Sequence, residues 1–85
     1  MISKYKRNDI EIIAHMLRLA KEETKKTHLM YRTNLCYGQL VIYVDFLLEK
    51  GFLEKKNNGQ GSLFCTTESG RDLLENIEKI MDQVR

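Results

Sequence analysis

The sequence predicts a small α+β domain that is mainly helical, with three helices, then a β-hairpin, then a fourth helix. Three observations lead to this prediction. The 85 residues suffice for one domain and not two. Apolar residues recur every three or four positions up to residue 50, as they do on one face of a helix. Beyond Gly51 that period ends, and two short apolar runs flank a segment rich in Asn and Gly, which favours a hairpin turn.

The first helix is expected to begin near residue 9. Asn8 or Asp9 can cap it, because side chains of this type accept hydrogen bonds from the free N–H groups of a first turn. Apolar residues cover more than one narrow face of this helix, so it is expected to be deeply packed or to meet a partner with part of its surface. The stripe expected to face the core and the second stripe are Ile10, Ile13, Leu17 and Ala20, and Ile12, Met16 and Leu19.

Two further helices are expected before residue 51. Thr24 is the expected cap of a helix over residues 25–33, with Leu29 and Met30 pointing inward and Tyr31 packed in the core. The run Asn34-Leu35-Cys36 predicts a tight turn, because Asn accepts turn conformations. A third helix is expected over residues 37–50, with Gly51 in a left-handed cap. Its core stripe has helical spacing: Leu40, Tyr43, Val44, Leu47 and Leu48.

The last third of the chain predicts a hairpin and a long helix. Strands are expected over residues 52–56 and 62–66, joined by a loop over residues 57–61, and Thr67 opens the last helix. A helix of about 17 residues, rising ~1.5 Å per residue, extends beyond a three-helix core of this size. We therefore expect its first part to pack inward, near Leu73 and Leu74, and residues 77–84 to pair with a second copy. The heptad-like seam assigned to this dimer interface is Leu73, Leu74, Ile77, Ile80, Met81 and Val84.

Charge is distributed unevenly along the chain. The net charge is +2, but residues 1–35 carry 8 Lys and Arg against 4 Asp and Glu, while residues 36–85 carry 6 against 8. A basic surface of this kind suits a polyanion, although a solvated helix face gives the same pattern. The two cysteines, Cys36 and Cys65, have no metal-ligand spacing, and neither a signal peptide nor a membrane span is recognisable. A reduced, cytoplasmic protein is expected.

The predicted order of elements is that of a winged helix-turn-helix. In such a pair of helices the second one projects outward and fits the major groove, and the hairpin, or wing, reaches neighbouring phosphates. Residues 1–68 are therefore assigned to a winged helix-turn-helix DNA-binding domain, and residues 69–85 to a C-terminal helix that is part core and part dimer seam.

Particular residues also resemble a known family. They are Lys25-Lys26-Thr27, Leu29-Met30-Tyr31, Asn34-Leu35, Tyr37, Gln39-Leu40, Tyr43, Leu47-Leu48-Glu49-Lys50-Gly51 and Thr66-Thr67-Glu68-Ser69-Gly70-Arg71. From about residue 9 to 81 the chain resembles the small archaeal winged-helix DNA-binding proteins and predicted transcriptional regulators. These include ten-kilodalton Sulfolobus proteins that dimerise through a C-terminal antiparallel coiled coil. The resemblance implies double-stranded DNA as partner, a homodimer, and a regulatory or chromatin-organising role in the nucleoid.

One departure from that family concerns the third helix. Members often carry basic residues on its exposed face, whereas here the face has no Lys or Arg and includes Asp45, and Cys36 stands where Ser or Thr is the better cap. Gln39 can pair with an adenine edge, and Val41 or Ile42 can touch a thymine methyl group. Phosphate contacts are then expected from the second helix and the wing. The assigned DNA-binding residues are Lys25, Lys26, His28, Arg32, Tyr37, Gly38, Gln39, Val41, Ile42, Lys55, Lys56, Asn57 and Asn58.

Other functional classes are weaker predictions. The neutral third helix leaves open a protein–protein adaptor that docks through Val41 and Ile42 and binds little or no DNA. A thiol sensor at Cys36 is a third idea, although two isolated cysteines are more simply structural. No nucleophile motif, phosphate loop or metal-ligand set is recognisable, so we expect neither an enzyme nor a cofactor, metal or small-molecule ligand.

Overall fold

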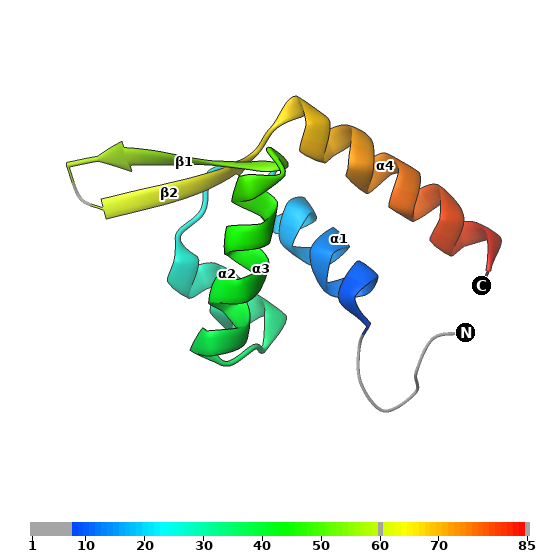
Figure 1. Ribbon diagram of the computed structural model, residues 1–85, viewed down its shortest axis with the longest axis horizontal. Coiled ribbons are helices and arrows are strands. Elements are labelled where there is room, and N and C mark those ends of the chain that lie inside the picture. Colours follow the sequence, from blue (N-terminus) through cyan, green and yellow to red (C-terminus); the bar gives the residue numbers. More distant parts are fainter. Residues whose placement is uncertain (1–7, 60, 85) are drawn as a thin grey trace.

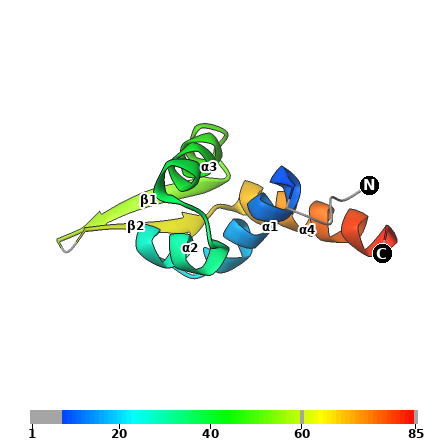
Figure 2. The ribbon, with the colours of Figure 1, turned by 90° about the horizontal axis from the view of Figure 1, so that it is seen from below.

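The computed structural model describes residues 8–59 and 61–84, apart from the side chain of residue 58. The elements follow one another as α1 (Asp9–Leu19), α2 (Lys26–Thr33), α3 (Tyr37–Glu49), β1 (Leu53–Asn58), β2 (Gly61–Thr66) and α4 (Glu68–Gln83). The wing, formed by β1 and β2, extends from one end of the molecule, while α4 runs toward the opposite end (Figures 1 and 2). This arrangement confirms the predicted fold class, a mainly helical α+β domain of winged helix-turn-helix type.

Helix α1 begins at a reciprocal cap. Asn8 Oδ1 accepts from the Glu11 N–H at 2.8 Å, and Glu11 Oε1 accepts from the Asn8 N–H at 3.2 Å, which selects Asn8 over Asp9 as the cap. Helices α2 and α4 and strand β2 all pack on α1, so most of its circumference is buried. The prediction for Ile10 was wrong: it lies in the first turn, at the edge of this buried arc, and is 50% exposed.

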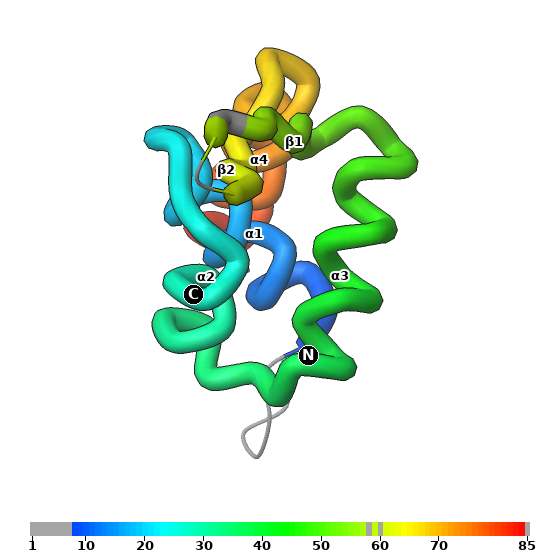
Figure 3. The backbone as a smooth tube through the Cα atoms, turned by 90° about the vertical axis from the view of Figure 1, so that its left-hand side faces the viewer, coloured from blue at the N-terminus to red at the C-terminus, as the bar shows by residue number. Residues whose placement is uncertain are grey.

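Helix α2 starts one residue later than its expected cap implies. Thr24 does not cap it, because the Thr24 backbone exchanges two hydrogen bonds with Phe64, at 3.0 and 2.8 Å, and so adds a bridge to the sheet. Lys25 occupies the cap position without a side-chain hydrogen bond to the helix. Asn34 ends α2 in the left-handed conformation, with φ of 60°, as expected of a turn residue. Helices α2 and α3 flank α1 on two sides (Figure 3).

The wing is longer than predicted, and its turn is tighter. Strands β1 and β2 are antiparallel and stay paired from Leu53↔Thr66 to Asn58↔Gly61, so residues 59 and 60 alone connect them. The expected five-residue loop was wrong because Asn57 and Gly61 belong to the ladder. Ser62 Oγ donates to Asn57 Oδ1 at 2.8 Å, which adds a cross-strand link at this register.

Helix α4 is anchored at its first turn. Thr67 caps it as predicted, accepting from the Gly70 N–H at 3.0 Å while its hydroxyl donates to the Gly51 carbonyl at 2.6 Å. Gly70 packs directly on the backbone carbonyl of Phe52 and the methyl group of Thr66, which leaves no space for a side chain. The close approach therefore fixes the angle at which α4 leaves the wing.

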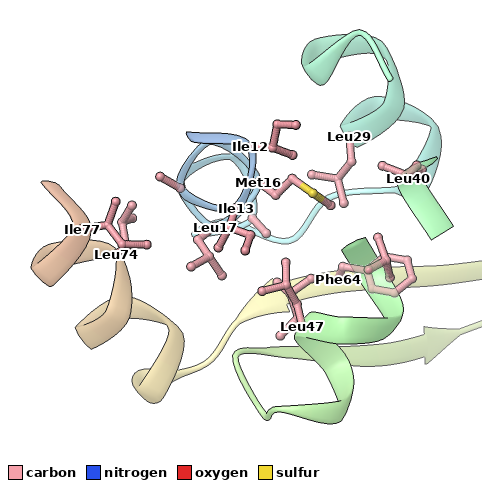
Figure 4. Packing of buried hydrophobic residues seen from close by; sticks show 14 residues of the cluster. Ile12, Ile13, Met16, Leu17, Leu29, Leu40, Leu47, Phe64, Leu74 and Ile77 are labelled. Carbon is pink, nitrogen blue, oxygen red and sulfur yellow. The ribbon is translucent and has the colours of Figure 1, made fainter. Parts of the chain in front are cut away.

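The core lies around α1 and joins all six elements (Figure 4). Met16, Leu17, Leu29, Leu40 and Leu47 are fully buried, and Phe64 of the wing is 1% exposed. Leu74 and Ile77 of α4 are 1% and 5% exposed, so these two residues of the predicted dimer seam pack in the core of their own chain. The prediction that the partner-facing part of the seam begins at Ile77 was therefore wrong.

Candidate nucleic-acid interface

Three lysines surround a hollow between the start of α2 and the wing. Lys25 and Lys26 approach it from the cap and first residue of α2 and Lys55 from β1, and its volume is about 270 Å³. Among the described residues, none of these lysines takes part in an ion pair. The first N–H groups of α2 have no side-chain cap. Uncapped N–H groups at a helix start attract anions, and here lysine ammonium groups stand beside them.

Aromatic rings position one of the lysines. The Nζ atom of Lys26 lies 5.7 Å from the centroid of the Tyr37 ring and 5.8 Å from that of the Phe64 ring. Rings at this distance attract a cation through their negative faces. Tyr37 belongs to α3 and Phe64 to the wing, so Lys26 is held where the helix-turn-helix meets the wing.

The neighbouring lysines Lys55 and Lys56 have different surroundings, although both were assigned to DNA. Successive strand residues point to opposite faces. Lys55 points toward the hollow, whereas Lys56 Nζ lies 3.0 Å from Glu23 Oε2 and 3.7 Å from Glu54 Oε1. The hydrogen bond and charge of Glu23 raise the pKa of Lys56, with a smaller contribution from Glu54. The structure therefore places Lys55 at the hollow with Lys25 and Lys26, and pairs Lys56 with two carboxylates.

Helix α2 carries its other assigned residues outside the hollow. Arg32 follows Lys26 by six residues and therefore projects from another side of the helix. His28 lines a shallow depression with Tyr31 and Leu63. The core position predicted for Tyr31 was wrong, because the buried arc of α2 is set by Leu29 and Thr33, and the Tyr31 side chain is 88% exposed.

The assigned residues of α3 lie on two different sides of that helix. Tyr37 is 60% exposed beside Lys26, and half-buried Val41, one turn later, shares its side. Ile42 is 69% exposed but faces the other way, toward α1, where it lines an apolar pocket of about 200 Å³. Gly38 is exposed at the start of the helix, and a Cβ added there would touch nothing within 4 Å.

Gln39 is engaged at the start of α3. Its Oε1 atom accepts from both the backbone N–H and the thiol of Cys36, each at 3.4 Å. Pairing of Gln39 with both edge atoms of an adenine therefore requires this local contact to open. In the wing, Asn57 Oδ1 accepts from Ser62, and the side chain of Asn58 lies outside the described residues.

The pocket beside Ile42 was not expected from the sequence. Asp9 and Ile13 of α1 and Tyr43 and Phe46 of α3 complete its lining. Phe46 is 41% exposed, and the Tyr43 hydroxyl donates to Asp9 Oδ1 at 2.6 Å across its rim. Phe46 lies four residues after Ile42, a helical spacing that could have placed both residues on one face before the structure was known.

The described part of the chain has neither a metal-binding cluster nor a membrane-spanning helix. No group of three or more His, Cys, Asp or Glu side chains in this part of the chain is arranged to hold a metal ion. Within residues 8–59 and 61–84, no helix combines the length and the apolar character that a membrane span requires.

Comparison with known proteins agrees with the observed arrangement. The family model described as winged helix-turn-helix matches residues 6–84. The uncharacterized protein MJ0287 of Methanocaldococcus jannaschii is 36% identical over 80 residues, which cover 93% of this chain and 78% of that protein.

Two solved structures are also similar. The crystal structure of Sso10a-2, a DNA-binding protein from Sulfolobus solfataricus, has a TM-score of 0.83 at 26% identity, covering 89% of this chain and 80% of that chain. The transcriptional regulator BldR from Sulfolobus solfataricus has a TM-score of 0.79 at 17% identity, a likeness of fold alone. The match covers 87% of this chain and 56% of BldR, so this chain spans about half the length of that protein.

Proposed function

This chain belongs to the winged helix-turn-helix family, and from that premise we propose that it binds double-stranded DNA as a homodimer and regulates transcription or organises the chromosome. The observation that carries the proposal is the hollow lined by Lys25, Lys26 and Lys55, the basic hollow. It lies where α2 and the wing meet, beside the exposed start of α3. The similarity to Sso10a-2, a DNA-binding protein, at 26% identity supports the same function.

The basic hollow is proposed to hold a backbone phosphate. Its three ammonium groups and the uncapped N–H groups of α2 supply charge and hydrogen-bond donors together. A phosphate at this place brings Tyr37, Gly38 and Val41 toward the edges of the bases in the major groove. Contacts with phosphates position the protein, and contacts with base edges distinguish sequences. Lys56 contributes less, because Glu23 and Glu54 compensate its charge.

The experiment is a titration of a fluorescent duplex with the full chain, followed by anisotropy at several salt concentrations. We expect saturable binding at low salt, with an association constant that falls steeply as salt rises. The slope of log K against log salt, divided by about 0.9, counts the phosphates neutralised. Absence of binding at the lowest salt refutes the proposal.

The dimer is proposed to involve the end of α4. Ile80 and Val84, one turn apart, are 61% and 65% exposed, while Met81 between them is half-buried. Exposed aliphatic side chains at this spacing form an apolar stripe that a second copy can cover. Sedimentation equilibrium should give a species of twice the 10.0 kDa chain mass. A concentration-independent mass of one chain refutes this part of the proposal.

A location in the nucleoid follows from the proposed DNA binding, and the proposed function includes no catalytic step. Selection of bound duplexes from a random pool separates the two roles. Enrichment of a defined motif indicates a regulator, and binding without enrichment indicates a chromosome-organising protein.

A further inference from the structure

Exposed apolar side chains gather on the side of the molecule away from the basic hollow. Five large ones lie on three helices: Ile10 on α1, Ile42 and Phe46 on α3, and Ile80 and Val84 on α4. Ile10 lies one turn before Ile13, so it shares the side of α1 that lines the apolar pocket. We call the surface of Ile10, Ile13, Ile42 and Phe46 the α1–α3 groove.

The end of α4 lies on the same side of the fold. Two contacts show that helices α1 and α4 run in opposite directions. Arg71 donates to the Lys21 carbonyl at 3.3 Å, and Arg18 pairs with Glu78 at 3.1 Å. The last turns of α4 therefore lie toward the first turn of α1, which carries Ile10 (Figures 1 and 2). The groove is concave, whereas Ile80 and Val84 stand on the convex surface of a helix.

The α4 stripe is too small to make a dimer by itself. A stable interface buries about 800 Å² on each partner. Two aliphatic side chains that are 61% and 65% exposed supply only a fraction of that area, because Leu74 and Ile77 already pack in the core of their own chain. Adding Ile10, Ile42 and Phe46 more than doubles the number of large apolar side chains that each copy covers.

We propose that Ile80 and Val84 of one copy dock into the α1–α3 groove of a second copy. A two-fold axis makes this contact twice, because each residue that meets a partner residue is met in the same way by the other copy. The inference rests on the proposed dimer and specifies how it is built. It also places one side of α3 in the dimer and the opposite side, with Tyr37 and Val41, against DNA. The contact thereby sets the separation of the two α3 helices, which determines the spacing of the DNA half-sites.

The test is a charge-complementation series on the full chain, measured by sedimentation equilibrium. Ile42→Lys and Val84→Glu each place one charge at the contact, and we expect each to raise the dimer dissociation constant by roughly 30-fold or more. The double variant brings Lys and Glu together and should recover at least about tenfold of that loss. Tyr31→Lys adds the same charge at an 88% exposed position on α2 and should leave the dimer unchanged.

Each other outcome overturns a specific part. If Val84→Glu dissociates the dimer and Ile42→Lys does not, α4 pairs with α4 and the groove assignment is wrong, while the dimer stands. If both single variants dissociate it and the double variant recovers nothing, the direct contact is wrong. A wild-type chain that stays monomeric removes both the dimer and the groove contact. Far-ultraviolet circular dichroism of every variant verifies that the fold is retained.

Discussion

The two sides of α3 present opposite chemistry. On the side of the wing, Tyr37 lies beside Lys26 and the basic hollow. On the side of α1, Ile42 and Phe46 line an apolar groove. The comparison teaches that a helix without a single Lys or Arg can still lie beside a basic hollow, because neighbouring elements supply the cations. It also shows that the exposed residues of α3 do not form one continuous surface, because Tyr37 and Ile42 lie on different sides of the helix.

Gly70 packs the start of α4 against the base of the wing, and replacing it should have the largest effect. A Cβ at this position meets the Phe52 carbonyl oxygen and, at 2.7 Å, the Thr66 methyl group. Gly70→Ala should therefore lower the free energy of unfolding by about 3 kcal/mol, the upper end for overpacking. Urea denaturation measures it. The matched control is Gly38→Ala, which has open space and should stabilise the helix by about 0.5–1 kcal/mol. Equal effects of the two substitutions contradict the close packing at Gly70.

Charge reversal in the basic hollow should weaken the proposed DNA contact alone. Lys25→Glu with Lys26→Glu removes two proposed phosphate contacts and adds repulsion, so duplex affinity at low salt should fall about 100-fold or more. Fluorescence anisotropy measures this change, and sedimentation should show an unaltered oligomeric state. Lys79→Glu, on the exposed surface of α4, is the control for charge and should lower affinity far less. A comparable loss in the control assigns the effect to net charge rather than to the hollow.

The neutral face of α3 gives a smaller, sequence-dependent prediction. If Val41 covers a thymine methyl group, a duplex with uracil in place of thymine should bind more weakly, by about fourfold for each methyl contact, since a buried carbon is worth about 0.8 kcal/mol. Competition between the two duplexes measures the difference. Val41→Ala should abolish the preference, whereas the groove residue Ile42 should not affect it when replaced by Ala. Equal binding of both duplexes leaves DNA binding in place and removes this contact.

The smallest expected difference separates Lys55 from Lys56. Lys55→Gln removes a cation from the basic hollow and should lower the salt slope by about 1. Lys56→Gln removes a lysine already paired with Glu23 and Glu54, so the slope should hardly change. Salt titrations of the two variants provide the comparison. A larger change for Lys56 indicates that its ion pairs open on DNA.

The sequence by itself determined the order of elements, most of the core and the fold class. Local rules were sufficient there, because caps such as Thr67 and stripes such as Leu40, Val44 and Leu47 depend on residues a few positions apart. The sequence also placed Lys25 and Lys26 at the second helix and Lys55 beside the wing, and the order of elements is enough to bring these two regions together.

Only the tertiary structure decided which side each surface residue faces. Thr24 does not cap α2 as expected, because its backbone forms two hydrogen bonds with Phe64, 40 residues later. Ile77 is buried in the core because α4 packs against α1. Ile42 lines the pocket between α1 and α3, whereas Val41 lies on another side of α3. These outcomes depend on the angles at which helices cross, and helical periodicity gives the face of one helix without giving the position of its neighbours.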